Sequence, residues 1–165
     1  MSWDLDLVPR EHADDPFDWL ESRGGAHDAA AVLAHAEAIR ARRPELELFG
    51  PDTDGSAELS MPEDSPFPLQ VYLFGDHAGV TVAYWDLGDE SAALPDLLYD
   101  VVSALVEATR WVPYDPQEGR PLELGELRDA FLGGHDEGVE LLKSLDAQPQ
   151  APPAPHKRKR FLGLF

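Results

Sequence analysis

Histidines and carboxylates are the side chains through which this chain could carry out acid–base or metal chemistry. The six histidines are His12, His27, His35, His77, His135 and His156, and none forms a His-x-His or His-Glu-x-x-His pattern. His27 and His35 are eight residues apart, which is too far for two ligands on adjacent helical turns. His135-Asp136-Glu137 is more typical of a helix start than of a metal site. We therefore expect no metal and no cofactor.

Patterns of nucleophilic catalysis are missing as well. The chain has no cysteine, which excludes thiol catalysis, an iron–sulfur site and a disulfide scaffold. It contains neither a Gly-x-Ser-x-Gly elbow nor a phosphate-binding loop. Asp76-His77 places an acid beside an imidazole, but no orienting third group accompanies it, so we interpret it as a surface turn. Asp52-Thr53-Asp54-Gly55 fails as a calcium loop, because Met61 stands where the twelfth-position Glu is required.

The charge of the chain is strongly acidic and unevenly distributed. There are 32 acidic and 13 basic residues among 165, a formal net charge of −19. Four of the basic residues form the run 157–160, which leaves nine for the rest of the chain. A body this acidic repels nucleic-acid phosphates and steers association toward a basic protein partner. We therefore expect no nucleic-acid binding through the body.

Period-two and β-branched patterns predict the strands of a sheet. Trp3, Leu5 and Leu7 alternate with polar residues, which predicts a strand over residues 3–8. Residues 70–74 and 80–85 read as two strands of a hairpin, and residues 111–114 as a further strand. Residues 46–49 and 57–61 are either short strands or a loop with apolar anchors.

Helical periodicity predicts two long helices. One covers about residues 29–43, with Asp28 as its N-cap, and the other covers residues 93–109 with a wide apolar stripe. Shorter helices are expected over 14–22, over 124–132, where Gly133-Gly134 would end the helix, and over 136–145. Because both long helices need one large apolar surface, we expect an α+β fold. Its mostly antiparallel sheet would carry the helices on one face, in a ferredoxin-like sandwich.

The C-terminal part of the chain differs in composition from the rest. Residues 1–146 form the expected acidic domain, and residues 147–155 are a Pro-rich linker. The tail, residues 156–165, is basic and then apolar, with Lys157, Arg158, Lys159, Arg160, Phe161, Leu162, Leu164 and Phe165 as its candidate binding residues. Apolar residues on a flexible linker favour a docking role, on an anionic membrane, in a protein groove or on the domain itself.

Two proline-containing motifs are further candidates for recognition. They are Asp64, Ser65, Pro66 and Phe67, and Tyr114, Asp115 and Gln117 around Pro116. An Asp near a Pro is typical of a turn, because the carboxylate accepts backbone N–H groups and Pro fixes φ. The alternative is that both motifs form one shared recognition patch. We favour the structural interpretation.

These motifs, with Met1-Ser2-Trp3-Asp4-Leu5 and Arg43-Pro44, also carry a resemblance. Over about residues 1–122 the chain resembles small acidic bacterial proteins of uncharacterised function. Those proteins have a Trp at the position of Phe67 and a Tyr in the arginine–proline step, which this chain lacks. The resemblance implies a compact fold and a partner-binding role of the toxin-immunity kind. It supplies no catalytic residue.

The combined expectation is a cytoplasmic, non-enzymatic acidic module that binds a basic protein, in an immunity-like manner. Two alternatives stay open. One is an adaptor whose tail docks to an anionic membrane or a protein groove. The other is a carboxylate-based enzyme, which would require a concave pocket holding two buried, close carboxylates.

Overall fold

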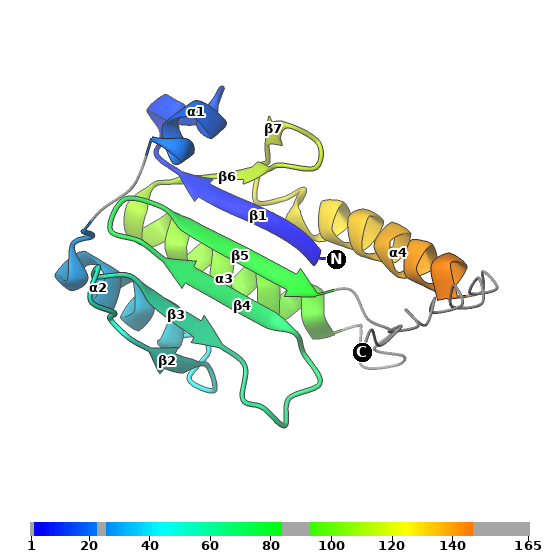
Figure 1. Cartoon of the computed structure of the whole chain (residues 1–165), viewed down its shortest axis with the longest axis horizontal. Helices are drawn as coiled ribbons and strands as arrows, with labels where there is room; N and C mark the ends of the chain where they lie inside the picture. Colours follow the sequence, from blue (N-terminus) through cyan, green and yellow to red (C-terminus); the bar gives the residue numbers. More distant parts are fainter. Residues whose placement is uncertain (1, 23–25, 84–92, 147–165) are drawn as a thin grey trace, which may run out of the picture.

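The computed structural model describes residues 2–22, 26–83 and 93–146, and its centre is a seven-stranded sheet (Figure 1). The strands are β1 (Ser2–Val8), β2 (Glu47–Phe49), β3 (Ala57–Ser60), β4 (Leu69–Leu73), β5 (Ala78–Ala83), β6 (Val112–Asp115) and β7 (Arg120–Pro121). Their order is β2-β3-β4-β5-β1-β6-β7, and all neighbouring strands are antiparallel. Strand β1 therefore lies inside the sheet, between β5 and β6.

Three helices cover one face of this sheet, behind it in Figure 1. They are α2 (Ala29–Arg40), α3 (Leu94–Thr109) and α4 (Leu127–Asp146). A short helix, α1 (Pro16–Glu21), follows the 3₁₀ turn Arg10–His12 and packs at the other face, beside β6. The predicted α+β class, the antiparallel sheet and the placement of both long helices on one face are confirmed.

The buried face is built by side-chain alternation. Trp3, Leu5 and Leu7 of β1 are each at most 1% exposed and point toward the helices. Inward side chains of the neighbouring strands continue this layer, since Leu5 stands opposite Val80, and Val80 opposite Val71. The apolar stripe of α3 packs on them, with Leu98, Val101, Val102 and Leu105 fully buried. At about 25 cal/mol per Å² of apolar surface, this layer is the main favourable term in folding.

Local signals fix the ends of the helices. The Asp28 carboxylate accepts hydrogen bonds from the backbone N–H groups of Ala30 (3.0 Å) and Ala31 (3.3 Å), so the predicted N-cap of α2 is confirmed. Arg110, with a positive φ of 66°, ends α3 in the left-handed region. The helix predicted over residues 14–22 is α1, and Pro16 stands in its first turn, as expected.

The expectation that Gly133-Gly134 ends a helix is wrong, because α4 runs through both glycines as one helix of 20 residues. Gly134 lies against the indole of Trp3, where a Cβ would come within 2.8 Å of Cδ1. Phe131, one turn earlier, packs edge-on against the same indole, with ring centroids 5.2 Å apart. Because Gly134 has no side chain, α4 can approach β1 closely. The sequence around the two glycines does not reveal this role.

Three further expectations have distinct outcomes. The segments at 46–49 and 57–61, left open between strand and loop, form strands β2 and β3. The ferredoxin-like arrangement stays a prediction. Strands β1, β4, β5 and β6 alternate along the chain with helices α2 and α3 as that arrangement requires. However, β2, β3 and β7 widen the sheet, and α4 is an additional helix. Residues 84–85, the linker 147–155 and the tail 156–165 lie outside the described residues.

The two glycines of α4 make a matched pair for a stability test. No heavy atom lies within 4 Å of a Cβ built at Gly133, so Gly133→Ala should raise the free energy of unfolding by about 1 kcal/mol through helix propensity. Gly134→Ala gains the same propensity but overpacks Trp3, and should lower the free energy of unfolding by about 1 kcal/mol. Urea denaturation of both variants measures the difference. Equal stabilisation by both substitutions would contradict the close packing of α4 on Trp3.

Candidate functional site

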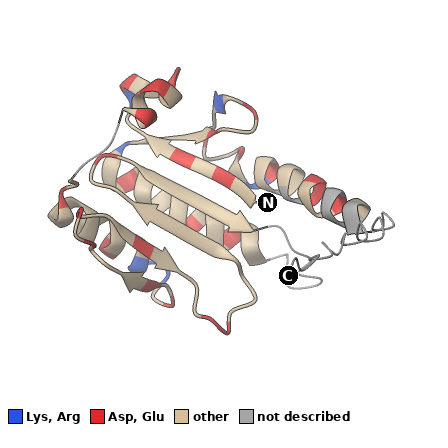
Figure 2. Cartoon of the chain, in the orientation of Figure 1, with Lys and Arg blue, Asp and Glu red and all other residues tan. Residues whose placement is uncertain are grey.

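The face of the sheet opposite α2, α3 and α4 is polar, and we call it the open face. It comprises the outward side chains of β1, β3, β4 and β5, namely Asp4, Asp6, Glu58, Ser60, Gln70, Tyr72 and Thr81. The strand register arranges them in two rows, Glu58–Tyr72–Gly79–Asp6 and Ser60–Gln70–Thr81–Asp4. Figure 2 shows two acidic bands on β1, in a view onto the side of the sheet that the three helices leave uncovered.

Asp4 and Asp6 are the charged centre of this face. Because they are two residues apart on one strand, both carboxylates project to the same side, about 7 Å apart along β1. The Asp4 carboxylate accepts hydrogen bonds from the hydroxyls of Thr81 and Ser2, each at 2.9 Å. No ion pair between described residues includes either carboxylate. The chain therefore presents two adjacent acids without a countercharge from the described residues.

Asp6 differs from Asp4 in its surroundings. It is half-buried, and a Cβ at Gly79 would lie 3.9 Å from its Oδ1, in ordinary van der Waals contact. Burial first, and the negative charge of Asp4 second, raise the pKa of Asp6 from 3.8 to about 6. The pKa of Tyr72 is also raised, by burial and by the charges of Glu58 and Asp4. A bound cation would offset the negative charges that help to raise the pKa values of Asp6 and Tyr72.

A groove of about 370 Å³ lies over these residues, between the strands and α1. Asp4, Asp6 and Thr81 supply its polar groups, while Leu20, Phe74 and Tyr72 supply apolar and aromatic surface. Carboxylates beside apolar walls suit an arginine or lysine side chain, which has an apolar stem and a charged head. The arrangement can therefore accept a basic side chain by contact with both kinds of surface.

His77 forms one wall of this groove. The expectation of a surface turn at Asp76-His77 is wrong for the imidazole, which is only 8% exposed. It stacks on Phe74, with ring centroids 4.3 Å apart, and meets the edge of Trp19 of α1. The Asp76 carboxylate lies 2.8 Å from its Nδ1. The tight hairpin turn folds the ring back under α1, and this burial depends on a helix distant in sequence.

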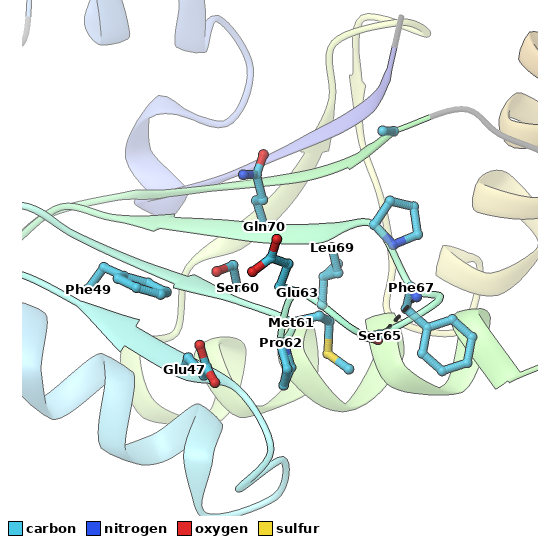
Figure 3. Close-up of a pocket in the computed structure, with 12 residues that line it drawn as sticks. Glu47, Phe49, Ser60, Met61, Pro62, Glu63, Ser65, Phe67, Leu69 and Gln70 are labelled. Atoms are coloured by element: carbon cyan, nitrogen blue, oxygen red, sulfur yellow. Dashed lines mark hydrogen bonds between the residues drawn. The ribbon is translucent and has the colours of Figure 1, made fainter.

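A second cavity, of about 640 Å³, adjoins the open face where β4 begins (Figure 3). It lies beneath the connection of residues 61–68 between β3 and β4. Phe49, Met61 and Phe67 supply apolar surface, and Glu47 and Glu63 supply carboxylates. Ser60 and Gln70 of the open face also line it, so the two surfaces are continuous.

The first predicted motif is placed at this second cavity. Ser65 and Phe67 line it, whereas Asp64 and Pro66 are exposed. The Ser65 hydroxyl accepts a hydrogen bond from the Phe67 N–H at 3.1 Å, so the side chain that shapes the turn is Ser65 rather than Asp64.

The second predicted motif forms the turn between β6 and β7. Asp115 is 2% exposed, and its carboxylate accepts hydrogen bonds from the N–H groups of Gln117 (2.8 Å) and Glu118 (3.1 Å). Tyr114 packs edge-on against Phe17. The side-chain amide of Gln117 is oriented by its hydrogen-bond partners. Its Nε2 donates to the backbone carbonyl of Asp4 at 3.0 Å, and its Oε1 accepts from the Asp4 N–H at 3.1 Å. This motif therefore helps to position β1.

The two motifs do not lie side by side, since β5 and β1 separate β4 from β6. The predicted tail residues, Lys157 to Phe165, lie outside the described residues. No sequence pattern pointed to Asp4, Asp6, Tyr72 or Thr81 as site residues. The alternation that predicts strand β1 already places Asp4 and Asp6 on one face, but the strand order that collects the others is not visible in sequence.

Comparisons with protein-family models, with curated proteins and with solved structures find no match. Within the described ranges there is no group of three or more histidines and carboxylates that could hold a metal ion. No described helix has both the length and the apolar character needed to cross a bilayer.

The raised pKa of Asp6 makes stability depend on pH. Between pH 4 and 6 the carboxyl ionises in the unfolded chain but stays protonated in the fold, so the free energy of unfolding falls as pH rises. Asp6→Asn, a neutral isostere, should remove this loss, which we expect to be about 2 kcal/mol. Urea denaturation at several pH values compares the two proteins. Parallel stability curves between pH 4 and 7 would show that Asp6 ionises normally in the fold.

Proposed function

We propose that the protein is a non-enzymatic binding module that takes a basic segment of a partner protein on its open face. The observation that carries the proposal is the pair Asp4 and Asp6 on the central strand, flanked by an open groove and without a countercharge from the described residues. An arginine or lysine side chain would supply that charge and would favour the ionised form of Asp6.

The distribution of cations supports this assignment. On the helix side, Arg42 pairs with Glu107, Arg43 with Asp100 and Arg128 with Asp96. Arg120 pairs with Glu118 and Glu126 beside β7. These described arginines are thus engaged away from the open face, where the acids of β1 and β3 carry the local charge. A negative field concentrated on one face would steer a basic partner to it.

An immunity-like role is the specific form of this function that we favour. A protein of this kind would cover the basic surface of a toxin, and its acidic face would raise the rate of association. The acidic composition and the resemblance to small acidic bacterial proteins support this form, and it would operate in the cytoplasm. Because Asp4 and Asp6 are half-buried, they differ from the buried carboxylate pair that we expect of a hydrolytic enzyme.

The tail supports a second candidate, an adaptor that docks to an anionic membrane or to a protein groove. Its evidence is compositional: four consecutive cations precede Phe161, Leu162, Leu164 and Phe165. Anionic lipid attracts such a block with about 1 kcal/mol per basic residue, and the aromatic side chains insert at the interface. Substitution of tail residues would abolish this activity and would not weaken binding at the open face.

A six-residue arginine peptide is a suitable probe of the open face. Asp4→Asn combined with Asp6→Asn should weaken its binding about tenfold at pH 8, because two charge-assisted contacts are lost. Native binding should also weaken as pH falls below 6, where Asp6 is protonated. Fluorescence anisotropy of the labelled peptide at low salt measures both effects.

The matched control is Glu37→Gln combined with Asp129→Asn, which removes the same charge from exposed sites on α2 and α4. This variant should change the affinity less than twofold. An equal loss in both double variants would mean that the peptide responds to net charge alone, and the open face would no longer be assigned as the site.

A further inference from the structure

The second cavity and the open face form one continuous surface. Gln70 joins them, because its side chain lines the cavity while it also contacts two residues of the open face. Tyr72 donates a hydrogen bond to the Gln70 Oε1, and the Gln70 Nε2 donates one to Glu58, both at 3.3 Å. A peptide that lies along this surface would therefore contact apolar groups at one end and carboxylates at the other.

The chemistry of this surface is apolar with acidic groups around it. Phe49 is 54% exposed on strand β2, and Met61 and Phe67 add apolar surface on the opposite side of the cavity (Figure 3). Glu47 and Glu63 line the same cavity, and Asp4 and Asp6 follow along the open face. A fitting ligand would combine several cations with large apolar side chains.

The C-terminal segment of the same chain has this composition. Residues 157–160 are four consecutive cations, and the next five residues include Phe161, Leu162, Leu164 and Phe165. Residues 157–160 hold four of the 13 basic residues of the whole chain. The charge of this block is therefore complementary to the open face, and its apolar end is complementary to the cavity.

The linker is long enough for the segment to reach this surface. Helix α4 passes Trp3 at Gly134, and Trp3 stands in the same row as Val82 and Leu69, at the end of the sheet that bears the cavity. From Gly134 to Asp146 the helix extends about 18 Å. Ten residues, 147–156, then span up to about 31–36 Å when extended. The way back to the open face runs about 18 Å along the helix direction and about two layer spacings of 10 Å each at right angles to it, a distance of about 27 Å, which this reach covers.

We infer that residues 156–165 dock in cis on the open face and in the adjoining cavity, where they compete with the partner. This inference rests on the proposed function, because it assigns the tail to the same surface. A linker of about ten residues gives an effective concentration of about 1 mM. A segment with an intrinsic Kd of about 0.1 mM would then occupy the surface and weaken partner binding about tenfold.

The absence of cysteine allows a single spin label to be placed without background. In full-length ¹⁵N-labelled protein, Ala154→Cys would carry a nitroxide next to the basic block. We expect it to broaden the amide signals of Ser60, Gln70 and Thr81, and to spare those of the exposed face of α3. Changing Lys157, Arg158, Lys159 and Arg160 to Gln should remove the broadening, as should 0.5 M salt, because both weaken charge attraction.

The arginine peptide separates failure of this inference from failure of the proposed function. If the tail docks in cis, the variant with four glutamines should bind the peptide about tenfold more tightly than the native chain. Unchanged affinity and no broadening, with the peptide still sensitive to Asp4→Asn and Asp6→Asn, would overturn the tail inference alone. Loss of that sensitivity would overturn the proposed function. Broadening that disappears on tenfold dilution would show docking between two copies and would overturn docking in cis.

Discussion

Strand β1 lies inside the sheet, and its alternation of buried and polar side chains constrains everything built around it. Trp3, Leu5 and Leu7 require an apolar layer on one side, which α2, α3 and α4 provide. Asp4 and Asp6 necessarily project to the other side, because successive strand residues point to opposite faces. A helix layer on that side would bury two carboxylates without countercharge, so the sheet keeps this face open. The open face, the proposed binding surface, is thus a direct consequence of how the core is made.

Electrostatic strain accompanies this arrangement. Asp6 is half-buried next to Asp4, and the raised pKa of its carboxyl shows that ionisation is unfavourable in the fold. A protein optimised for stability alone would place a neutral side chain here. On the helix side, Arg42, Arg43 and Arg128 pair with acids of α3, so these cations do not compensate the negative field of the open face. A basic ligand would relieve the strain, so the proposed binding would be coupled to stability at this residue.

Sequence patterns predicted the parts of the fold that depend on local periodicity. The alternation in residues 3–8, the apolar stripe of α3 and the Asp28 cap each specify an element from a few neighbouring residues, and each is confirmed. Gly133-Gly134 was misjudged because its role depends on Trp3, which is more than 100 residues away. The burial of His77 beside α1 depends on a helix distant in sequence. The placement of Gln70 and Tyr72 in the same rows as Asp4 and Asp6 depends on the strand order. Long-range packing of this kind leaves no periodic signal in the chain.

The central claim is that the open face, rather than the helix side, receives basic ligands. The most direct measurement is a ¹H–¹⁵N correlation spectrum of the full chain at pH 8, titrated with the six-residue arginine peptide. Our account predicts that the largest shifts occur at Asp4, Asp6, Tyr72, Gly79 and Thr81, with small shifts along the exposed faces of α2, α3 and α4. Shifts concentrated on the helices, or spread evenly over all acidic residues, would contradict it.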